Sequence, residues 1–203
     1  YATNFRTAYA PGTLDEILNP AKFRSTAIWG PAHEVGHVHQ TGIGMKWIGM
    51  TEVTNNIMSL HVQTTFGNRS RQIEDDRYAT GFRTLLCHDY PFCTSDGDGG
   101  NDVFVQLSPF WQLQLYNAKV LGKSGFYPDM YEQVRIDEAA ITPTDGEAQI
   151  NFVKMACQKS GYNLLKFFER WGFLTPVDKT IDDYAQRQLT VTPEMIDRVK
   201  AEI

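Results

Sequence analysis

Apolar residues recur at spacings of three and four along most of the chain, the repeat of a helix with one buried face. The repeat is plain in "GEAQINFVKMACQKSG" and "NLLKFFERWGFL", and it continues, interrupted by proline, in "VFVQLSPFWQLQLYNAKVLG" and "FYPDMYEQVRIDEAA". Thr192 and Pro193 suit the start of a last helix, "PEMIDRVKAEI". One short strand is predicted in "FRTAYA" near the start. The pattern predicts a mainly α fold with little β-structure.

Two further helices are predicted in the first third of the chain. Pro31 suits the first turn of a helix that starts near Gly30, and Gly42 suits the residue just past its end. The stretch "TEVTNNIMSLHVQTTFG" predicts a second helix, with Thr51 as its cap and Gly67 as its stop. These two helices carry the polar residues that point to a function.

Composition narrows the class of protein before any motif is considered. The chain has 203 residues, of which 42% are hydrophobic and 21% charged, with a formal net charge of -5. This indicates one globular unit spanning residues 1–203, and the absence of a basic run argues against nucleic-acid binding. No stretch has the roughly 20 apolar residues of a membrane-spanning helix, so the chain is not expected to be membrane-embedded. Because it starts at Tyr1 without a leader, we expect a piece of a longer protein.

The first of the two helices contains His33-Glu34-Val35-Gly36-His37, the pattern H-E-x-x-H. Histidines four apart lie one turn apart on the same face, so both imidazoles can reach one metal ion. Glu34 lies about 100° further round the helix, where it can hold a water rather than the metal. Five histidines in the whole chain make a chance match rare. The motif predicts a catalytic zinc site, with His33 and His37 as ligands and Glu34 as general base.

A catalytic zinc ion needs a third protein ligand. A metzincin would supply a histidine six residues after the second one, but Ile43 stands there, and Gln40 replaces the glycine of that motif. The second helix offers Glu52, with Asn55 and Asn56 well placed on the same face to hydrogen-bond a ligand. This arrangement of two histidines and a helical glutamate is that of a gluzincin. The rival carboxylates lie in a charged run typical of a solvated face; they are Glu74, Asp75 and Asp76.

Other residues near the motif have more than one interpretation. His39 is two residues past His37, so it should point away from the metal, as a core or surface histidine. Gln40 either packs in the interior or lies at the rim of the site. Gly36 is small enough to let another element approach the metal helix closely.

Aromatic residues supply candidates for other roles. Tyrosine is a common donor to the oxyanion formed in peptide hydrolysis, and three tyrosines remain open for this role: Tyr90, Tyr116 and Tyr127. Trp47 and Trp111 could stack on a sugar, although aromatics at helical spacing are more typical of a core.

The three cysteines and one glycine-rich stretch are also candidate functional motifs. Cys87 and Cys93 are either reduced or joined in a small disulfide, and Cys157 is expected to be a buried free thiol in a helix. The stretch "DGDGGND" begins like a calcium loop, but Gly100 and Leu107 stand where oxygen ligands are required, so a surface loop is favoured.

The sequence resembles the peptidase M60 family, which includes viral enhancins and bacterial mucin-degrading glycopeptidases. The resemblance lies in "AYAPGTL", "GPAHEVGHVHQ", "TEVTNNIMSL" and "LSPFWQLQLY", in this order over roughly the first 120 residues. It implies a helical gluzincin-type catalytic lobe and a secreted or cell-surface zinc endopeptidase that cleaves mucin-like glycoproteins. It also implies that His33, His37 and Glu52 bind zinc and that Glu34 is the general base.

Three alternatives for function remain open. The chain is a zinc endopeptidase for glycoproteins, a zinc peptidase with no glycan requirement, or a metal-containing fragment that binds glycoproteins without cleaving them. A gluzincin usually has a sheet-containing lobe before its metal helix, and only 32 residues precede His33 here. Most of that lobe is therefore expected to be absent, unless "FRTAYA" is its last strand. No feature of the sequence specifies an oligomeric state.

Overall fold

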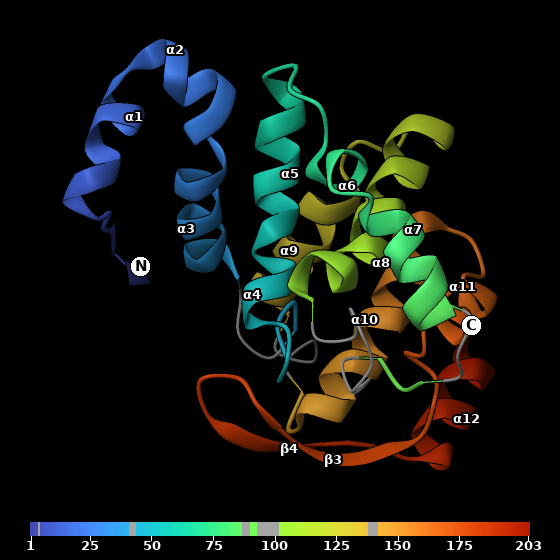
Figure 1. Ribbon diagram of the computed structural model, residues 1–203. Coiled ribbons are helices and arrows are strands. Elements are labelled where there is room, and N and C mark those ends of the chain that lie inside the picture. Colours follow the sequence, from blue (N-terminus) through green and yellow to red (C-terminus); the bar gives the residue numbers. More distant parts are fainter. Residues whose placement is uncertain (4, 41–43, 87–89, 93–101, 138–141) are drawn as a thin grey trace.

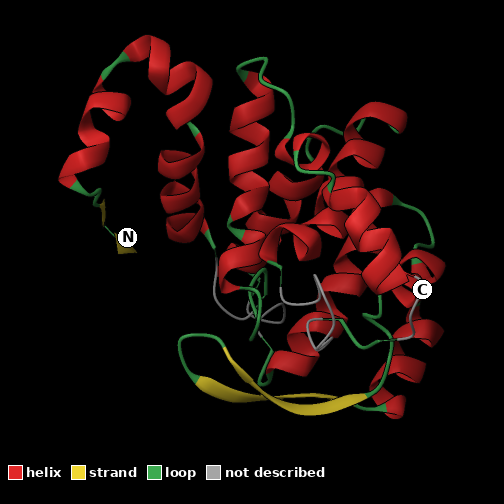
Figure 2. Cartoon of the chain, viewed as in Figure 1, coloured by secondary structure: helices red, strands yellow, loops and turns green. Residues whose placement is uncertain are grey.

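The computed structural model describes residues 1–3, 5–40, 44–86, 90–92, 102–137 and 142–203. These residues are mainly helical, with two small antiparallel hairpins, as the sequence predicts (Figure 2). The helices are α1 (Leu14–Leu18), α2 (Pro20–Lys22), α3 (Trp29–His39), α4 (Thr51–Thr54), α5 (Asn56–Thr65), α6 (Arg71–Glu74), α7 (Arg77–Gly81), α8 (Val103–Leu115), α9 (Phe126–Ile136), α10 (Asp145–Ser160), α11 (Leu165–Arg170) and α12 (Pro193–Glu202). The strands are β1 (Ala2–Thr3), β2 (Arg6–Thr7), β3 (Val177–Asp182) and β4 (Gln186–Val191). Short 3-10 or π-helical turns are η1 (Pro11–Thr13), η2 (Phe23–Ala27), η3 (Phe82–Leu86) and η4 (Tyr116–Val120).

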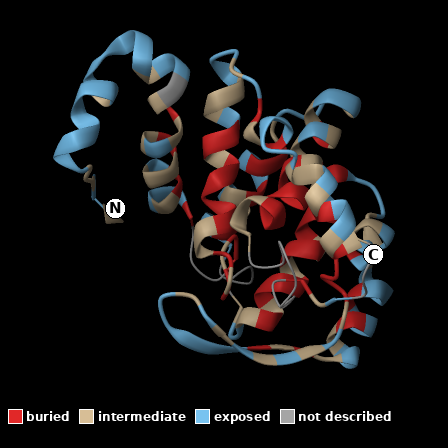
Figure 3. Cartoon of the chain, in the orientation of Figure 1, coloured by how far each residue is buried: buried red, intermediate tan, exposed pale blue. Residues whose placement is uncertain are grey.

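The N-terminal part is a hairpin followed by an exposed helical arm. Strand β2 lies within "FRTAYA", which confirms the predicted short strand, and it pairs with β1. Helices α1 and α2 lie apart from the other helices, and their residues are almost all exposed (Figures 1 and 3). Helix α3 then packs on α5 and on the β1–β2 hairpin. The metal-motif helix is thus held between the N-terminal hairpin and the main helical body.

The borders of the two motif-bearing helices differ in detail from the prediction. Helix α3 ends at His39, before the predicted stop at Gly42, because the backbone of Gln40 turns to an extended conformation with ψ 98°. The predicted second helix is divided into α4 and α5 at Asn55. Thr51 is the first residue of α4 and not its cap. Asn55 itself keeps right-handed helical angles, so α4 and α5 follow one another with little change of face.

The core lies around α8, α10 and the loop that precedes α4. Trp47, Phe110, Phe152 and Phe173 are buried and their rings pack on one another. Burial of each such side chain contributes roughly 1.5–3 kcal/mol to folding. Trp111 is also buried, so both Trp47 and Trp111 belong to the core, which favours the packing interpretation over sugar stacking. Figure 3 shows this buried centre surrounded by exposed helix faces.

The C-terminal part adds a hairpin and a closing helix. Strands β3 and β4 pair in antiparallel register from Val177 with Val191 to Asp182 with Gln186. Helix α10 packs on β4 through Gly146, where a Cβ atom would lie 1.7 Å from the carbonyl oxygen of Thr190. The hairpin extends past α10, and its turn reaches towards α4 (Figure 1). Among the described residues, the helices are too short or too polar to span a bilayer.

Candidate metal centre

Helix α3 presents His33 and His37 on one face, as the four-residue spacing predicts. The two imidazole Nε2 atoms lie 3.2 Å apart, and the rings are nearly perpendicular at 86°. Both side chains are about one fifth exposed, at 23% and 19%. Two nitrogen atoms therefore converge at a point that solvent can reach.

Glu52 on α4 brings a carboxylate oxygen to the same point. Its Oε2 atom lies 3.1 Å from Nε2 of His33 and 3.4 Å from Nε2 of His37. Ligands bound tetrahedrally at zinc distances of 2.0–2.1 Å would be separated by about 3.3 Å. Among the residues that the structure describes, these three residues form the one group of His, Cys, Asp and Glu side chains that could share a metal ion. The donor set fits a tetrahedral site with one position left open.

A buried amide contacts Nδ1 of each histidine. Asn56 Oδ1 lies 2.9 Å from Nδ1 of His33, and Gln40 Oε1 lies 3.1 Å from Nδ1 of His37. Each amide is oriented by its own NH₂ group, because Asn56 donates to the carbonyl of Glu52 and Gln40 donates to the carbonyl of Met50. Asn56 and Gln40 thus favour the tautomer in which Nδ1 donates and Nε2 carries the electron pair, while Asn55 Nδ2, 3.0 Å from Nδ1 of His33, competes for that ring nitrogen.

The electrostatics agree with a cation between these groups. Burial opposes protonation of His33, but hydrogen bonds to Glu52 and Asn56 outweigh it and raise its pKa. Hydrogen bonds from His33 and His37, and one from Tyr184, hold the pKa of Glu52 far below its usual value. A carboxylate and two imidazole electron pairs in contact repel one another unless a proton or a metal ion lies among them.

Close contact between α3 and the following helices brings the ligands together. A Cβ atom at Gly36 would lie 2.3 Å from the backbone oxygen of Asn55, so only glycine fits there. This confirms the predicted role of Gly36 in a close approach. The Asn55 side chain also enters the site, with Nδ2 3.0 Å from Nε2 of His37 and its buried Oδ1 without a partner among the described residues.

Glu34 lies beside the three candidate ligands and outside their cluster. Its Oε2 atom is buried and has no hydrogen-bond partner among the described residues. Its other oxygen, Oε1, lies 3.2 Å from the amino group of Tyr1. A carboxylate with a free oxygen beside a metal position can accept a proton from a water molecule.

The site opens into a cleft of about 420 Å³. Its walls come from the N-terminal hairpin, α3, α4 and the turn of the C-terminal hairpin. The lining residues are Tyr1, Ala2, Thr3, His33, Glu34, His37, Lys46, Thr51, Glu52 and Tyr184. The groups that can bind a metal and move a proton thus face a space large enough for a few residues of a peptide.

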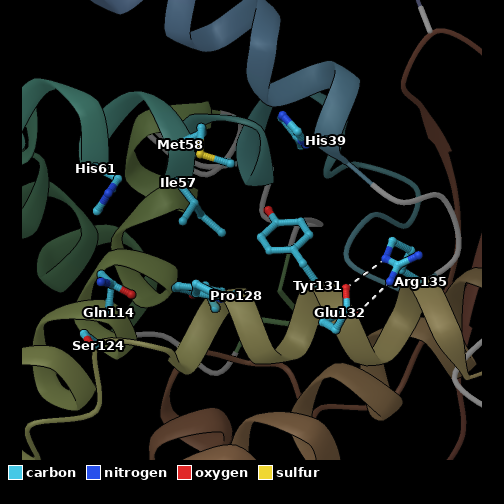
Figure 4. A pocket seen from close by; sticks show the side chains of 11 residues that line it. His39, Ile57, Met58, His61, Gln114, Ser124, Pro128, Tyr131, Glu132 and Arg135 are labelled. Atoms are coloured by element: carbon cyan, nitrogen blue, oxygen red, sulfur yellow. Dashed lines mark hydrogen bonds and ion pairs between the residues drawn. The ribbon is translucent and has the colours of Figure 1, made fainter.

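A second cavity of about 410 Å³ lies between α3, α5, α8 and α9 (Figure 4). Ile57, Met58 and Pro128 give it an apolar lining, and Glu132 and Arg135 form an ion pair at its edge. His39 lines this cavity and not the cleft, so it points away from the ligand cluster as predicted. The second cavity is separate from the metal centre.

Other candidates from the sequence lie elsewhere. Glu74, Asp75 and Asp76 are exposed on or beside α6, outside the ligand cluster, and Asp75 pairs with Arg77 at 3.5 Å. Cys157 is a buried free thiol, as predicted. Cys87 and Cys93, and the loop proposed for calcium, lie outside the described residues.

The three candidate oxyanion donors do not line the cleft. The hydroxyl of Tyr127 is buried and donates to the carbonyl of Phe110, Tyr116 packs against Tyr162, and Tyr90 is also absent from the cleft lining. Tyr1 and Tyr184 line the cleft instead, and the hydroxyl of Tyr184 donates to Glu52 Oε1 at 2.6 Å. Alternating residues in "VDKTIDD" and "QRQLTV" could have predicted the hairpin that carries Tyr184, but not its position at the metal centre.

Solved structures of metallopeptidases have the same fold. A metallopeptidase from Bacteroides thetaiotaomicron is 27% identical with a TM-score of 0.79, and the match covers 95% of this chain and 33% of that one. A metallopeptidase in complex with Tn antigen is 27% identical with a TM-score of 0.76, over 94% of this chain and 35% of the other. A Bacillus anthracis protein described as functionally unknown is 32% identical with a TM-score of 0.75, over 99% and 36%.

The curated relatives are named channel-associated factors and not peptidases. TRPM8 channel-associated factor 2 from Homo sapiens is 28% identical over 177 residues, which are 84% of this chain and 18% of that protein. A TRPM8 channel-associated factor homolog from Danio rerio is 27% identical over 187 residues, or 85% and 18%. The chain therefore spans about a fifth of these relatives and about a third of the solved structures.

The family described as peptidase M60, enhancin and enhancin-like, matches residues 1–172. This range contains the H-E-x-x-H helix, Glu52 and the two amides that orient the histidines. It covers most of the 203 residues. The chain belongs to the peptidase M60 family.

Proposed function

We propose that residues 1–203 are the metal-binding, helical part of the catalytic domain of a zinc-dependent endopeptidase. His33, His37 and Glu52 would bind the zinc ion, and Glu34 would be the general base. One observation carries the proposal: two Nε2 electron pairs and one carboxylate oxygen converge at tetrahedral spacing in an open cleft. A structural zinc site is usually closed by four protein ligands, so three ligands beside an unpaired carboxylate favour catalysis.

The side chains of the chain supply the proton transfers of peptide hydrolysis. A bound zinc ion would lower the pKa of a water molecule and polarise the carbonyl of the scissile bond. Glu34 takes a proton from the attacking water, since its Oε2 atom has no other partner among the described residues. The protonated Glu34 then gives that proton to the leaving amine as the C–N bond breaks. Gln40 and Asn56 contact Nδ1 of the two histidines and so keep Nε2 of each directed at the metal position.

The proposed substrates are glycosylated, mucin-like proteins. The relative solved in complex with Tn antigen supports this choice, as does membership of the enhancin-like family. With such substrates, we propose that the protein acts outside the cell or on its surface. A zinc peptidase without a glycan requirement is the nearest rival, because the proposed ligands and base act on a peptide bond with or without a nearby sugar.

Cleavage assays separate these functions. Purified protein loaded with zinc is incubated with a mucin-type glycopeptide and with the same peptide after enzymatic deglycosylation. We expect cleavage of the glycopeptide alone, abolished by a chelator, and a 10²- to 10⁴-fold lower rate for Glu34→Gln with unchanged zinc content. Equal cleavage of both peptides would reject the glycan requirement, and full activity of Glu34→Gln would reject its role as base.

A second candidate function is binding without cleavage. The curated relatives are named channel-associated factors, and the chain covers only about a third of the solved metallopeptidases. In that case the protein holds zinc and binds a glycopeptide, but the peptide stays intact after prolonged incubation. Mass spectrometry of the bound peptide distinguishes this outcome from slow hydrolysis.

A further inference from the structure

The turn of the β3–β4 hairpin contacts Glu52 directly, although 132 residues separate Glu52 from Tyr184. The Tyr184 hydroxyl donates to Oε1 of Glu52 at 2.6 Å, whereas Oε2 of the same carboxylate faces His33 and His37. The two oxygens thus have separate partners. A hydrogen bond to one oxygen limits rotation of the carboxylate and keeps the other oxygen directed at the histidines.

The neighbouring residue of the turn holds the backbone that carries Glu52. Asp183 Oδ2 accepts hydrogen bonds from the amide of Gly49 at 2.9 Å and from the amide of Thr51 at 3.1 Å. Thr51 is the first residue of α4, directly before Glu52. Asp183 and Tyr184, which we call the hairpin tip, therefore hold both the main chain and the side chain at this position.

The conformation of Tyr184 indicates that its position is imposed by these contacts. Its φ of 61° lies in the left-handed region, which disfavours side chains other than those of glycine, asparagine and aspartate. Its residue is 82% exposed, so burial of the ring does not explain the placement. The hydroxyl contact with Glu52 is the polar interaction that the side chain gains there.

The hairpin behind the tip is anchored firmly enough to position a ligand. Leu189 and Val191 of β4 are buried in the core. Arg187 pairs with Asp145 at 3.2 Å, and the same carboxylate oxygen accepts from the amide of Ile48 at 2.6 Å. The loop before α4 is thus joined to the hairpin at two points, through Asp145 and through Asp183.

We propose that the hairpin tip is a positioning device for the metal centre, in which Tyr184 orients Glu52 as a ligand. This proposal rests on the proposed function, because it assumes that Glu52 binds zinc. The family match ends at residue 172, before the hairpin begins, so it assigns no role to these residues. Tyr184 also lines the cleft, which places it beside any bound peptide.

Zinc affinity tests the proposal without any substrate. The dissociation constant for zinc is measured by competition with a chromogenic chelator for wild type, Tyr184→Phe and the matched control Tyr162→Phe, whose ring lies away from the cleft. We expect Tyr184→Phe to weaken binding about tenfold and Tyr162→Phe to leave it unchanged. The melting temperature of metal-free Tyr184→Phe should fall by only a few degrees, since the substitution removes a single exposed hydrogen bond and leaves the buried anchor of the hairpin intact.

A double-mutant cycle shows whether Tyr184 acts through Glu52. In a Glu52→Gln background, we expect Tyr184→Phe to cause no further loss of zinc affinity. The same tenfold loss in that background, or equal affinity of Tyr184→Phe and wild type, would overturn the positioning role. Wild-type protein that binds no zinc would overturn this proposal and the proposed function together. Zinc binding that depends on Tyr184 without cleavage of any peptide would overturn the proposed function alone.

Discussion

Gly36 on α3 lies directly against the main chain of Asn55, with room for no side chain between them: a Cβ atom would lie 2.3 Å from the Asn55 carbonyl oxygen. This contact places His33 and His37 opposite the segment that carries Glu52. Direct contact between main chains therefore fixes the distance from α3 to the α4–α5 segment. This leaves little freedom in the spacing of the ligand atoms.

Substitution of Gly36 should expose this constraint. Alanine is the better helix former by about 1 kcal/mol, but at Gly36 it must push α3 away from Asn55. We expect Gly36→Ala to lower the free energy of unfolding by about 1–3 kcal/mol and to weaken zinc binding. Denaturant unfolding and zinc titration provide the two measurements.

Gly30 provides the matched control on the same helix. A Cβ atom at Gly30 would meet no atom within 4 Å, so Gly30→Ala should leave zinc binding unchanged and be neutral or slightly stabilising. Equal stability of the two alanine variants would show that the Gly36 contact does not limit the helix separation.

Metal content should depend on the proposed ligands and not on their neighbour. Elemental analysis of purified protein is expected to give about one zinc per chain for wild type, and much less for His33→Ala, His37→Ala double-substituted protein. His39→Ala is the control, since His39 lies on the same helix but faces the second cavity (Figure 4). Loss of zinc in His39→Ala, or its retention in the double variant, would show that the ligand set is misassigned.

Gln40 should matter for metal binding although it offers no ligand atom to the cluster. It is buried, accepts from Nδ1 of His37 and donates to Thr54 Oγ1 at 2.8 Å. Gln40→Ala should weaken zinc binding by about 10- to 100-fold because His37 loses the partner that orients it. Isothermal titration with zinc measures the change. A variant that is folded and binds zinc as tightly as wild type would show that His37 needs no such partner.

The stability of the metal-free protein should depend on pH, because the pKa values of His33 and Glu52 are shifted in the folded state. The pKa of His33 is raised above 6.5, so its contribution to stability is complete below pH 6.5 and is lost as pH rises through the raised value. The pKa of Glu52 is lowered from 4.5, so its contribution is complete above pH 4.5 and is lost at more acidic pH. Both contributions are therefore present together between pH 4.5 and 6.5.

Thermal unfolding measured at several pH values, with a chelator present to remove metal, tests this pH range. The difference in melting temperature between wild type and Glu52→Gln should be larger at pH 5.5 than at pH 8, and the comparison cancels the other titrating groups. Zinc should have the opposite dependence, since it binds neutral imidazole and is favoured as pH rises. A difference between the two proteins that does not change with pH would mean that His33 and Glu52 do not form a charged pair.

The sequence by itself was enough to predict the helical class, the family and the ligand candidates. Helical spacing is a local property, so His33 and His37 one turn apart, and Asn56 one turn after Glu52, follow from residue order alone. The same reasoning correctly assigned Gly36 to a close approach, because few other reasons favour glycine within a helix.

Only the tertiary structure decided which distant groups complete the site. Gln40 lies just past the end of α3, and its role depends on a loop ten residues further on that folds back to meet its amide. Tyr184 lies on a hairpin 132 residues from Glu52, while three nearer or more obvious tyrosines are outside the cleft. No repeat or spacing in the sequence predicts either contact. Each contact arises from packing between segments whose separation along the chain is not set by helix or strand geometry.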